Sequence, residues 1–433
     1  MKKIVLGFII CLNLVAVSAQ NTATAVHKFT LEDCLNYALG NNYNKQSMKL
    51  SEDATKSAYD QSKMERLPNL NASLNESLSS NKENSSSWNG NYGLSTNLTL
   101  YQGGNISNTI EQNKLKMEQS SYQTSQYENT LTVRILQAFL SVLGNEELLK
   151  YQYAVVNASE EQSKQGKAQF EAGQILESDY LLLEAQYAND KNNITDTQIA
   201  IENSLLTLKS LLSMNPLEDI QIIYPDTTAL SEMSFIPSRE YVLDRAKNTL
   251  PDFKISQYSV DIANMGTKLA KSSYFPTVSL YGNAGTGHYN NYSNFGQQLS
   301  DRVNAQVGVS LSIPVYDNSR TKSKVTQSRI ALQQAELDKK QTELDIIQNI
   351  TTDYQDVISA YNKYQTTDIR QNAYRKTFEA YQAQFNAGSI TAVNLLQQQN
   401  NYISAMNDYI QSKYGFMLKR KILDVYIGVP VKM

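Results

Sequence analysis

Few side chains in this sequence have the types and the spacing that catalysis or metal binding requires. His27 and His288 are its two histidines, and they lie far apart in the chain. No cluster of cysteine, histidine and aspartate has metal-ligand spacing. The sequence also contains no phosphate-binding loop, nucleophile elbow or dinucleotide-binding fingerprint. We therefore expect no enzyme, no catalytic site, no cofactor and no metal ion.

The charge distribution gives no sign of a nucleic-acid partner. The chain has 39 basic and 42 acidic residues and a formal net charge of −3, and the two signs are interspersed. Nucleic-acid-binding domains concentrate Lys and Arg on one face or along one helix. The polar residues that recur at regular spacing, described next, are uncharged.

Four segments alternate apolar residues with Asn, Gln, Ser, Thr or Gly, which is typical of strands with one apolar and one hydrated face. We expect strands at 69–80, 91–101, 276–287 and 303–316, joined by exposed loops at Ser79–Gly90 and His288–Arg302. The hydrated face would contain Asn69, Asn71, Ser95, Asn97, Asn304, Gln306 and Ser310.

These strands fit either a soluble sandwich or a membrane β-barrel. A sandwich needs a second sheet to cover the apolar face, and nothing else in the chain predicts one. Transmembrane strands need only about ten residues, apolar at every second position. The pattern therefore favours a barrel with the hydrated face toward its lumen. Because four strands cannot close and lipid tolerates no open sheet edge, several chains would have to contribute.

The N-terminus has the pattern of a secretory signal peptide. Two lysines precede the apolar run Ile4–Val17, and Val17-Ser18-Ala19 supplies small residues for cleavage after Ala19. The run is shorter than the ~20 residues of a spanning helix. Cys11 follows a branched residue, which argues against a lipid anchor. The mature chain then keeps only Cys34, which we expect in a hydrophobic core.

The rest of the chain is an internal two-fold repeat. Leu98–Gly104 matches Ile313–Ser319, and Phe170–Gly173 matches Phe385–Gly388, both at an offset of 215 residues. Upstream, Pro68 matches Pro276 at an offset of 208. One inserted residue rotates every later helical side chain by about 100°. A constant offset between these markers therefore predicts a continuous helix.

Each half should contain one very long helix, at 105–171 and 317–386, free of proline and about 100 Å in length. Shorter helices at 30–66 and 176–213 would stack end to end beside the first, and a return helix at 389–420 would follow the second. Coiled-coil seams of 3-4-3 spacing are formed by Val133, Leu136, Leu140 and Leu143, and by Ile347, Ile350, Tyr354, Val357, Tyr361 and Tyr364.

The expected domain plan is a signal peptide at 1–19, a first repeat at 20–213, a connector at 214–240, a second repeat at 241–420 and a C-terminal segment at 421–433. The proline-containing connector should wrap the outside near the middle, with the C-terminal segment beside it. Gly173 and Gly388 should mark the hairpin tips, where glycine supplies a left-handed turn. The expected fold class is mainly α, with long α-helical hairpins and four β-strands.

The order and spacing of these features resemble the TolC-like outer-membrane factors, also called outer-membrane efflux proteins. The resemblance covers nearly the whole mature chain and implies a homotrimer, in which three chains of four strands close a 12-strand β-barrel continued by a helical α-barrel. It is carried by Leu67-Pro68 and Phe275-Pro276 before strands, Leu100–Gly104 after a strand, the Phe-x-Ala-Gly tips and the opening segment Thr30–Ala38.

The resemblance also implies conduction without chemistry. The barrel would cross the outer membrane of a Gram-negative bacterium, in contact with its lipid. The tunnel would meet a periplasmic adaptor protein and, through it, an inner-membrane pump of the RND, ABC or MFS type. Drugs, metals, peptides and secreted proteins all stay open as cargo.

The best-known member of this family narrows its periplasmic entrance with an aspartate ring and with tyrosine and arginine links between helices. Aligned on the tips, the tyrosine and arginine positions are Phe385 and Ile390, the aspartates fall on Asn394 and Gln397, and Asp179 keeps its acid. We therefore expect an entrance that is less acidic than that of the relative and less sensitive to divalent cations. Asn394 and Gln397 would otherwise be ordinary polar positions of a helix. The tips, Gly173-Gln174-Ile175 and Gly388-Ser389-Ile390, are candidate adaptor-docking residues.

Two other classes of protein compete with the channel. A periplasmic adaptor also has coiled-coil hairpins, but it normally carries one hairpin with small β-domains, not two full repeats. An exported coiled-coil structural protein would explain the polar helices but not the four strands.

Overall fold

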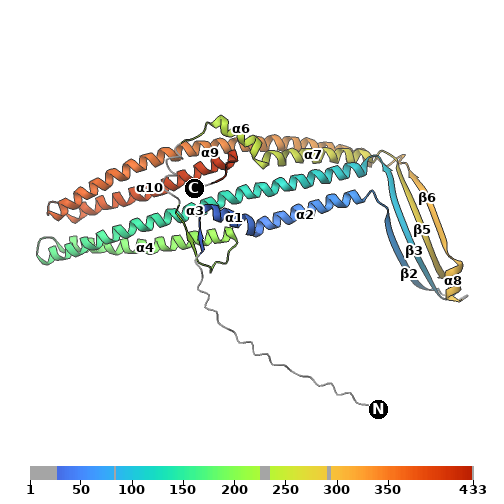
Figure 1. Ribbon diagram of the computed structural model, residues 1–433, viewed down its shortest axis with the longest axis horizontal. Helices are drawn as coiled ribbons and strands as arrows, with labels where there is room; N and C mark the ends of the chain where they lie inside the picture. The colour runs from blue at the N-terminus through green and yellow to red at the C-terminus, as the bar shows by residue number, and fades with distance from the viewer. Residues whose placement is uncertain (1–26, 82–83, 225–234, 290–293, 432–433) are drawn as a thin grey trace, which may run out of the picture.

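The computed structural model describes residues 27–81, 84–224, 235–289 and 294–431. The signal peptide at 1–19, with Cys11, lies outside these residues. The molecule is strongly elongated, with a four-stranded sheet at one end and helices that run away from it to two hairpin tips (Figure 1). Within the described part of the chain, no helix is both long and apolar enough to cross a membrane.

The two halves contain the same elements in the same order. The first half has α1 (Leu31–Asn41), α2 (Tyr43–Met64), β2 (Asn69–Asn81), β3 (Asn84–Gln102), α3 (Asn105–Glu171) and α4 (Glu177–Leu212). The second has α6 (Arg239–Thr249), α7 (Pro251–Ser272), β5 (Thr277–Tyr289), β6 (Asn304–Ser312), α9 (Arg320–Asn386) and α10 (Ala392–Ile427), with α8 (Phe295–Asp301) before β6.

Equivalent helices have equal lengths. Both α3 and α9 have 67 residues, both α4 and α10 have 36, and both α2 and α7 have 22. The constant offsets in the sequence therefore do correspond to helices without insertions. Each long helix lies beside two shorter ones stacked end to end, as expected, with α2 and α4 along α3 and with α7 and α10 along α9.

The elements form one layer with two open edges. The sheet order is β2-β3-β5-β6, antiparallel throughout. Beside the sheet, neighbouring helices follow the order α2-α3-α7-α9. Toward the tips, the α3–α4 and α9–α10 hairpins lie side by side, and α10 contacts both α3 and α4. At the sheet end, one edge of the layer is therefore β2 and α2, and the other is β6 and α9.

The main hydrophobic core lies at mid-length, where α1, α6 and the ends of α4 and α10 meet the middle of α3. Both predicted seams contribute, since Leu136, Leu143, Ile350 and Val357 are at most 2% exposed. Cys34 is fully buried in this core, and burial raises the pKa of its thiol to about 12. The expected buried thiol is confirmed.

The single helix expected over 30–66 is two helices in the structure, and they separate at Asn42. Its backbone is extended, and its side chain accepts a hydrogen bond from the Lys45 amide and donates one to the Leu211 carbonyl. A buried polar cap of this kind starts a new helix, so α1 and α2 are separate. Leu250 holds the equivalent break in the second half, before Pro251.

The strand bounds also differ from those expected. The loop expected at Ser79–Gly90 is mostly strand, because β2 and β3 keep pairing through residues that are polar on both faces. The segment expected as a loop at His288–Arg302 contains α8. Strand β6 stops at Ser312, short of the expected 316, since Pro314 cannot donate to a ladder.

The start of α9 and the end of α10 differ from the predicted bounds. Helix α9 begins at Arg320, not 317, because Asn318 and Ser319 have positive φ, as Gly103 and Gly104 do in the first half. Helix α10 continues to Ile427, so most of the expected C-terminal segment is helical.

The described part of the connector lies at mid-length, beside the end of α10. The Arg420 guanidinium donates to the Phe235 carbonyl there. A short parallel pair of strands, β1 (His27–Phe29) and β4 (Ile220–Ile222), was not expected. It ties the start of the chain to the connector.

Candidate functional site

The sheet brings all seven predicted hydrated residues onto one face. Asn71 is paired with Ser95, Ser95 with Asn283, and Asn283 with Gln306, so one polar row crosses all four strands. Cross-strand partners share a face of the sheet. By the same registers, this face also contains Asn69, Asn97, Asn304 and Ser310.

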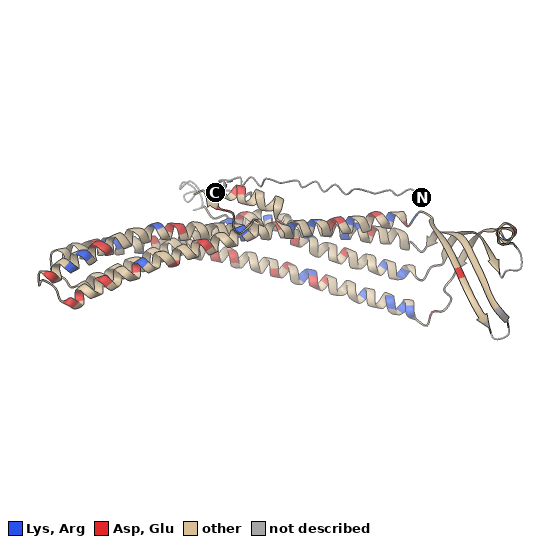
Figure 2. Cartoon of the chain, turned by 90° about the horizontal axis from the view of Figure 1, so that it is seen from below, with Lys and Arg blue, Asp and Glu red and all other residues tan. Residues whose placement is uncertain are grey.

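The opposite face is apolar and exposed. Leu70, Leu74, Val307 and Val309 are between 64% and 80% exposed. Among β2, β3, β5 and β6, Glu76 is the one Asp, Glu, Lys or Arg side chain, and it contacts His288 of β5. Figure 2 shows the contrast with the helices, where acidic and basic residues are spread along the whole length. A large exposed apolar face of this kind is typical of a surface that contacts a membrane or another protein.

At the far end, two equivalent turns form the hairpin tips. Gly173 and Gly388 both have a φ of +71°, and neither is near another group, since a Cβ on either would meet nothing within 4 Å. In each turn the residue after the glycine donates back to a helical carbonyl, from Gln174 to Gln169 and from Ser389 to Gln384. This pattern is the Schellman motif, which satisfies the last carbonyls of a helix.

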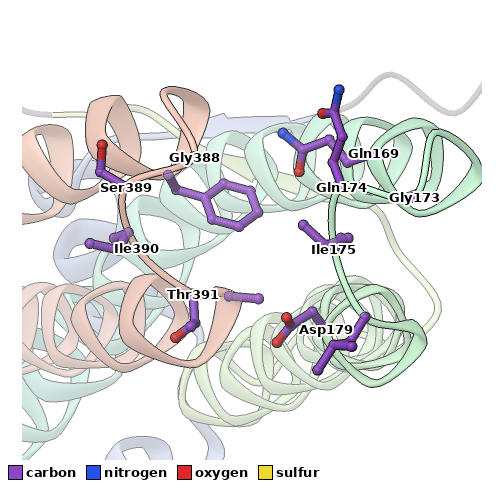
Figure 3. A pocket seen from close by; sticks show the side chains of 12 residues that line it. Gln169, Gly173, Gln174, Ile175, Asp179, Gly388, Ser389, Ile390 and Thr391 are labelled. Carbon is purple, nitrogen blue, oxygen red and sulfur yellow. The ribbon is translucent and has the colours of Figure 1, made fainter.

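A pocket of about 410 Å³ lies between the two tips (Figure 3). It contains most of the residues proposed from the sequence for entrance and docking. Those that line it are Gly173, Gln174, Ile175, Asp179, Phe385, Gly388, Ser389 and Ile390. Asn394 and Gln397 are not among its lining residues and lie exposed on α10.

The two tips differ in chemistry although their backbones match. Phe385 is 2% exposed and packs with Leu183 of α4 and Leu395 of α10, whereas its equivalent Phe170 is 36% exposed. The first turn of α4 contains Glu177 and Asp179, and the first turn of α10 contains no acidic residue. The acidic residues at the tips therefore all belong to the first hairpin, with Glu171 at the end of α3 and Glu177 and Asp179 at the start of α4.

Sequence reasoning missed a buried polar contact between the two hairpins. Asp190 of α4 is 3% exposed and accepts hydrogen bonds from Gln186 and, across the hairpins, from Gln399 of α10. Burial raises the pKa of its carboxyl more than the hydrogen bonds from Ser159 and Gln186 lower it. The stretch around Asp190 is polar throughout, so its pattern gives no sign of burial.

The residues that the structure describes contain no group of three His, Cys, Asp or Glu side chains placed to hold a metal ion. The candidate functional surfaces are a polar sheet face, an apolar sheet face and a pair of hairpin tips. This combination fits a subunit of a membrane channel with a long helical part.

The sequence profile of the family "Outer membrane efflux protein" matches residues 34–213 and 242–428, so the chain belongs to this family. It is similar to outer membrane protein TolC of Vibrio cholerae, with 23% identity over 428 residues, covering 96% of this chain and 94% of that protein. Alkaline protease secretion protein AprF of Pseudomonas aeruginosa is 22% identical, covering 69% of this chain and 61% of that protein.

Solved structures show the same fold. The MtrE outer membrane channel of Neisseria gonorrhoeae, in its open state, superposes with a TM-score of 0.76 at 18% identity, covering 92% of this chain and 89% of that one. The outer-membrane channel OprN gives a TM-score of 0.77 at 18% identity. The family assignment favours the channel over the adaptor and the structural protein.

Asp190 should make thermal stability depend on pH. Because its folded-state pKa is raised, stability falls as pH rises through that value, and below about pH 4 both states are protonated and no penalty applies. Asp190→Asn should therefore raise the melting temperature, followed by circular dichroism, at pH 8 but not at pH 4. Asp196→Asn, at an exposed carboxylate of the same helix, is the control and should change neither value. An equal effect of Asp190→Asn at both pH values would contradict the prediction.

Proposed function

We propose that this chain is the outer-membrane channel component of a tripartite efflux or export system. The observation that carries the proposal is the sheet, which has one polar face, one exposed apolar face and two open edges. In lipid, such a sheet satisfies its backbone only when it closes with further strands. Three copies would close a 12-strand barrel with the apolar face toward lipid and the polar row toward the lumen.

The helices support the same arrangement. Their layer has the same two open edges as the sheet and continues it away from the membrane, so a closed barrel would continue as a helical tunnel. A periplasmic adaptor would bind the tips and connect the channel to an inner-membrane pump, which supplies the energy. The neutral polar lumen residues favour passage of varied solutes over selection of one ion.

The first experiment is the protein mass of the detergent-extracted particle, measured by light scattering with the detergent contribution subtracted. We expect three chains per particle and extraction from the outer membrane only with detergent. A stable monomer, or release without detergent, would remove the channel and favour a periplasmic protein.

Adaptor docking is tested at the tip glycines. Because both have open space around them, Gly173→Trp with Gly388→Trp should obstruct a docking partner without disturbing the three-chain particle. Asn tolerates a positive φ, so Gly173→Asn with Gly388→Asn is the matched backbone control and should keep function. We would first identify toxic compounds to which cells lacking this chain are sensitive. The measurement is the resistance to these compounds of cells that produce each variant. Full resistance in the tryptophan variant would reject docking at these residues.

The entrance should respond weakly to divalent cations, because the first hairpin alone contributes acidic residues at the tips, Glu171, Glu177 and Asp179. Millimolar Mg²⁺ or Ca²⁺ should leave the single-channel current in a planar bilayer nearly unchanged. A strong block that persists in Asp179→Ala would show that the cation binds elsewhere and that this account of the entrance is wrong.

A further inference from the structure

We propose that a buried polar cluster between the two hairpins binds a monovalent metal cation, Na⁺ or K⁺. The cluster consists of Ser159 and Gln162 of α3, Asp190 of α4 and Gln399 of α10. It lies within a single chain, so the proposal goes beyond the proposed function and does not depend on it. The four residues are far apart in the sequence and come together only through the packing of the helices.

All four side chains are removed from solvent, with exposed fractions between 1% and 3%. The Asp190 carboxylate accepts a hydrogen bond from Gln186 at 2.8 Å and one from Gln399 at 3.4 Å. The Ser159 hydroxyl also lies within hydrogen-bonding reach of this carboxylate. These contacts are all neutral, and a buried carboxylate is costly unless a positive charge accompanies it.

Asp190 forms no ion pair with any residue that the structure describes. Asp424, the other Asp or Glu among the buried residues described, pairs with Arg420 at 2.6 Å. The fold itself does not require a carboxylate here, because the equivalent position at the offset of 215 is Ala405, which is 1% exposed. No described side chain balances the charge of Asp190, which points to a bound cation.

Neutral oxygens are available beside the carboxylate. Both amide atoms of Gln162, and Oε1 of Gln399, are buried without a hydrogen-bond partner in the described structure. Buried polar atoms are nearly always paired, so several unpaired atoms around one carboxylate point to a site that takes a ligand. Turning the Gln399 amide over would bring its oxygen to the place of its nitrogen, 3.4 Å from Oδ2 of Asp190. Both oxygens could then contact one ion.

The pattern of burial along α3 places Gln162 next to Asp190. Ser159, Gln162 and Gly166 are buried at spacings of three and four residues, so they share one face of the helix. Ser159 reaches Asp190, and a Cβ on Gly166 would lie 2.5 Å from Leu183 of α4. Gln162 therefore faces α4 between these two contacts.

Apolar groups close the cluster on both sides along the helices. Toward the tips, Leu183, Phe385 and Leu395 form the small apolar cluster. Toward the sheet, the rings of Tyr151 and Tyr402 lie 5.6 Å apart. Such surroundings have a low dielectric constant, which strengthens the attraction between a carboxylate and a cation.

The charge of the cluster favours a monovalent ion. Asp190 is its one acidic residue, so a single positive charge neutralises it, whereas a divalent ion would leave an uncompensated charge buried. Ca²⁺ also takes about six to eight oxygen ligands. The site is separate from the entrance, because Asp190 lies roughly 16 Å beyond Asp179 along α4. A bound cation would hold α10 of the second hairpin against α3 and α4 of the first.

Hydrogen–deuterium exchange of the detergent-extracted particle, followed by mass spectrometry, tests the site. We would compare NaCl, KCl and choline chloride at equal ionic strength and neutral pH, since choline is too large for a buried site. Peptides that contain Gln162, Asp190 or Gln399 should exchange several-fold more slowly in NaCl or KCl than in choline chloride. Equal exchange in the three salts would overturn the proposal.

Two variants locate the cation. Asp190→Asn keeps the shape of the side chain without its charge and should abolish the difference between salts, whereas the exposed control Asp196→Asn should retain it. Gln162→Leu removes a neutral oxygen and should reduce the difference. A difference that persists in Asp190→Asn would place the cation elsewhere and overturn the site. Slow exchange produced by MgCl₂ but not by NaCl or KCl would overturn the assignment of a monovalent ion.

The same ion changes the pH effect described above for Asp190→Asn. That effect applies with choline as the only cation, where the carboxylate has no counter-ion and the variant is the more stable protein at pH 8. In NaCl, the bound cation should remove most of this advantage. An advantage of equal size in both salts would contradict the bound cation and leave the channel standing.

Discussion

The outer strands β2 and β6 each present a row of backbone N–H and C=O groups that the four-stranded sheet leaves at its edge. In water such edges invite uncontrolled pairing, and in lipid each unpaired group costs several kcal/mol. The same strands also expose a row of leucines and valines to solvent. Closure with further copies satisfies both at once, and the whole layer of helices has its edges in the places that such closure requires.

The internal repeat gives the two halves the same packing. Because helix lengths are equal in the two halves, a long helix packs beside a short one in the same way twice in one chain, as α3 with α2 and as α9 with α7. Between the halves, heptad-spaced glutamines of α3 donate to α7, since an amide reaches a backbone carbonyl of a neighbouring helix. The two halves then diverge where function needs it. Near the tips, the acidic residues belong to the first half, the buried Phe385 belongs to the second, and the Asp190–Gln399 contact joins the two halves.

The mid-length core divides the molecule into these two regions. It gathers most of the large buried side chains and ties α1, α6 and the connector to the long helices. Beyond it, the helices toward the tips have only a small cluster around Leu183, Phe385 and Leu395, together with buried polar groups. A tip region with few apolar contacts is the part of the chain best able to change its packing at low cost.

The sequence alone predicts the order of the repeated elements, the approximate length of the long helices, the tips and the polar face of the sheet. These features depend on local periodicity and on constant offsets, which can be read from one chain. The sequence did not reveal the break at Asn42, because a single asparagine within a polar helix looks like any surface residue until the Leu211 carbonyl is seen beside it. It misjudged the loop at Ser79–Gly90, because strands that are polar on both faces have no alternation to read. The burial of Phe385 but not of Phe170, and the contact of Asp190 with Gln399, follow from how the two hairpins pack. Both involve residues that lie far apart in the chain, so local sequence patterns give no sign of them.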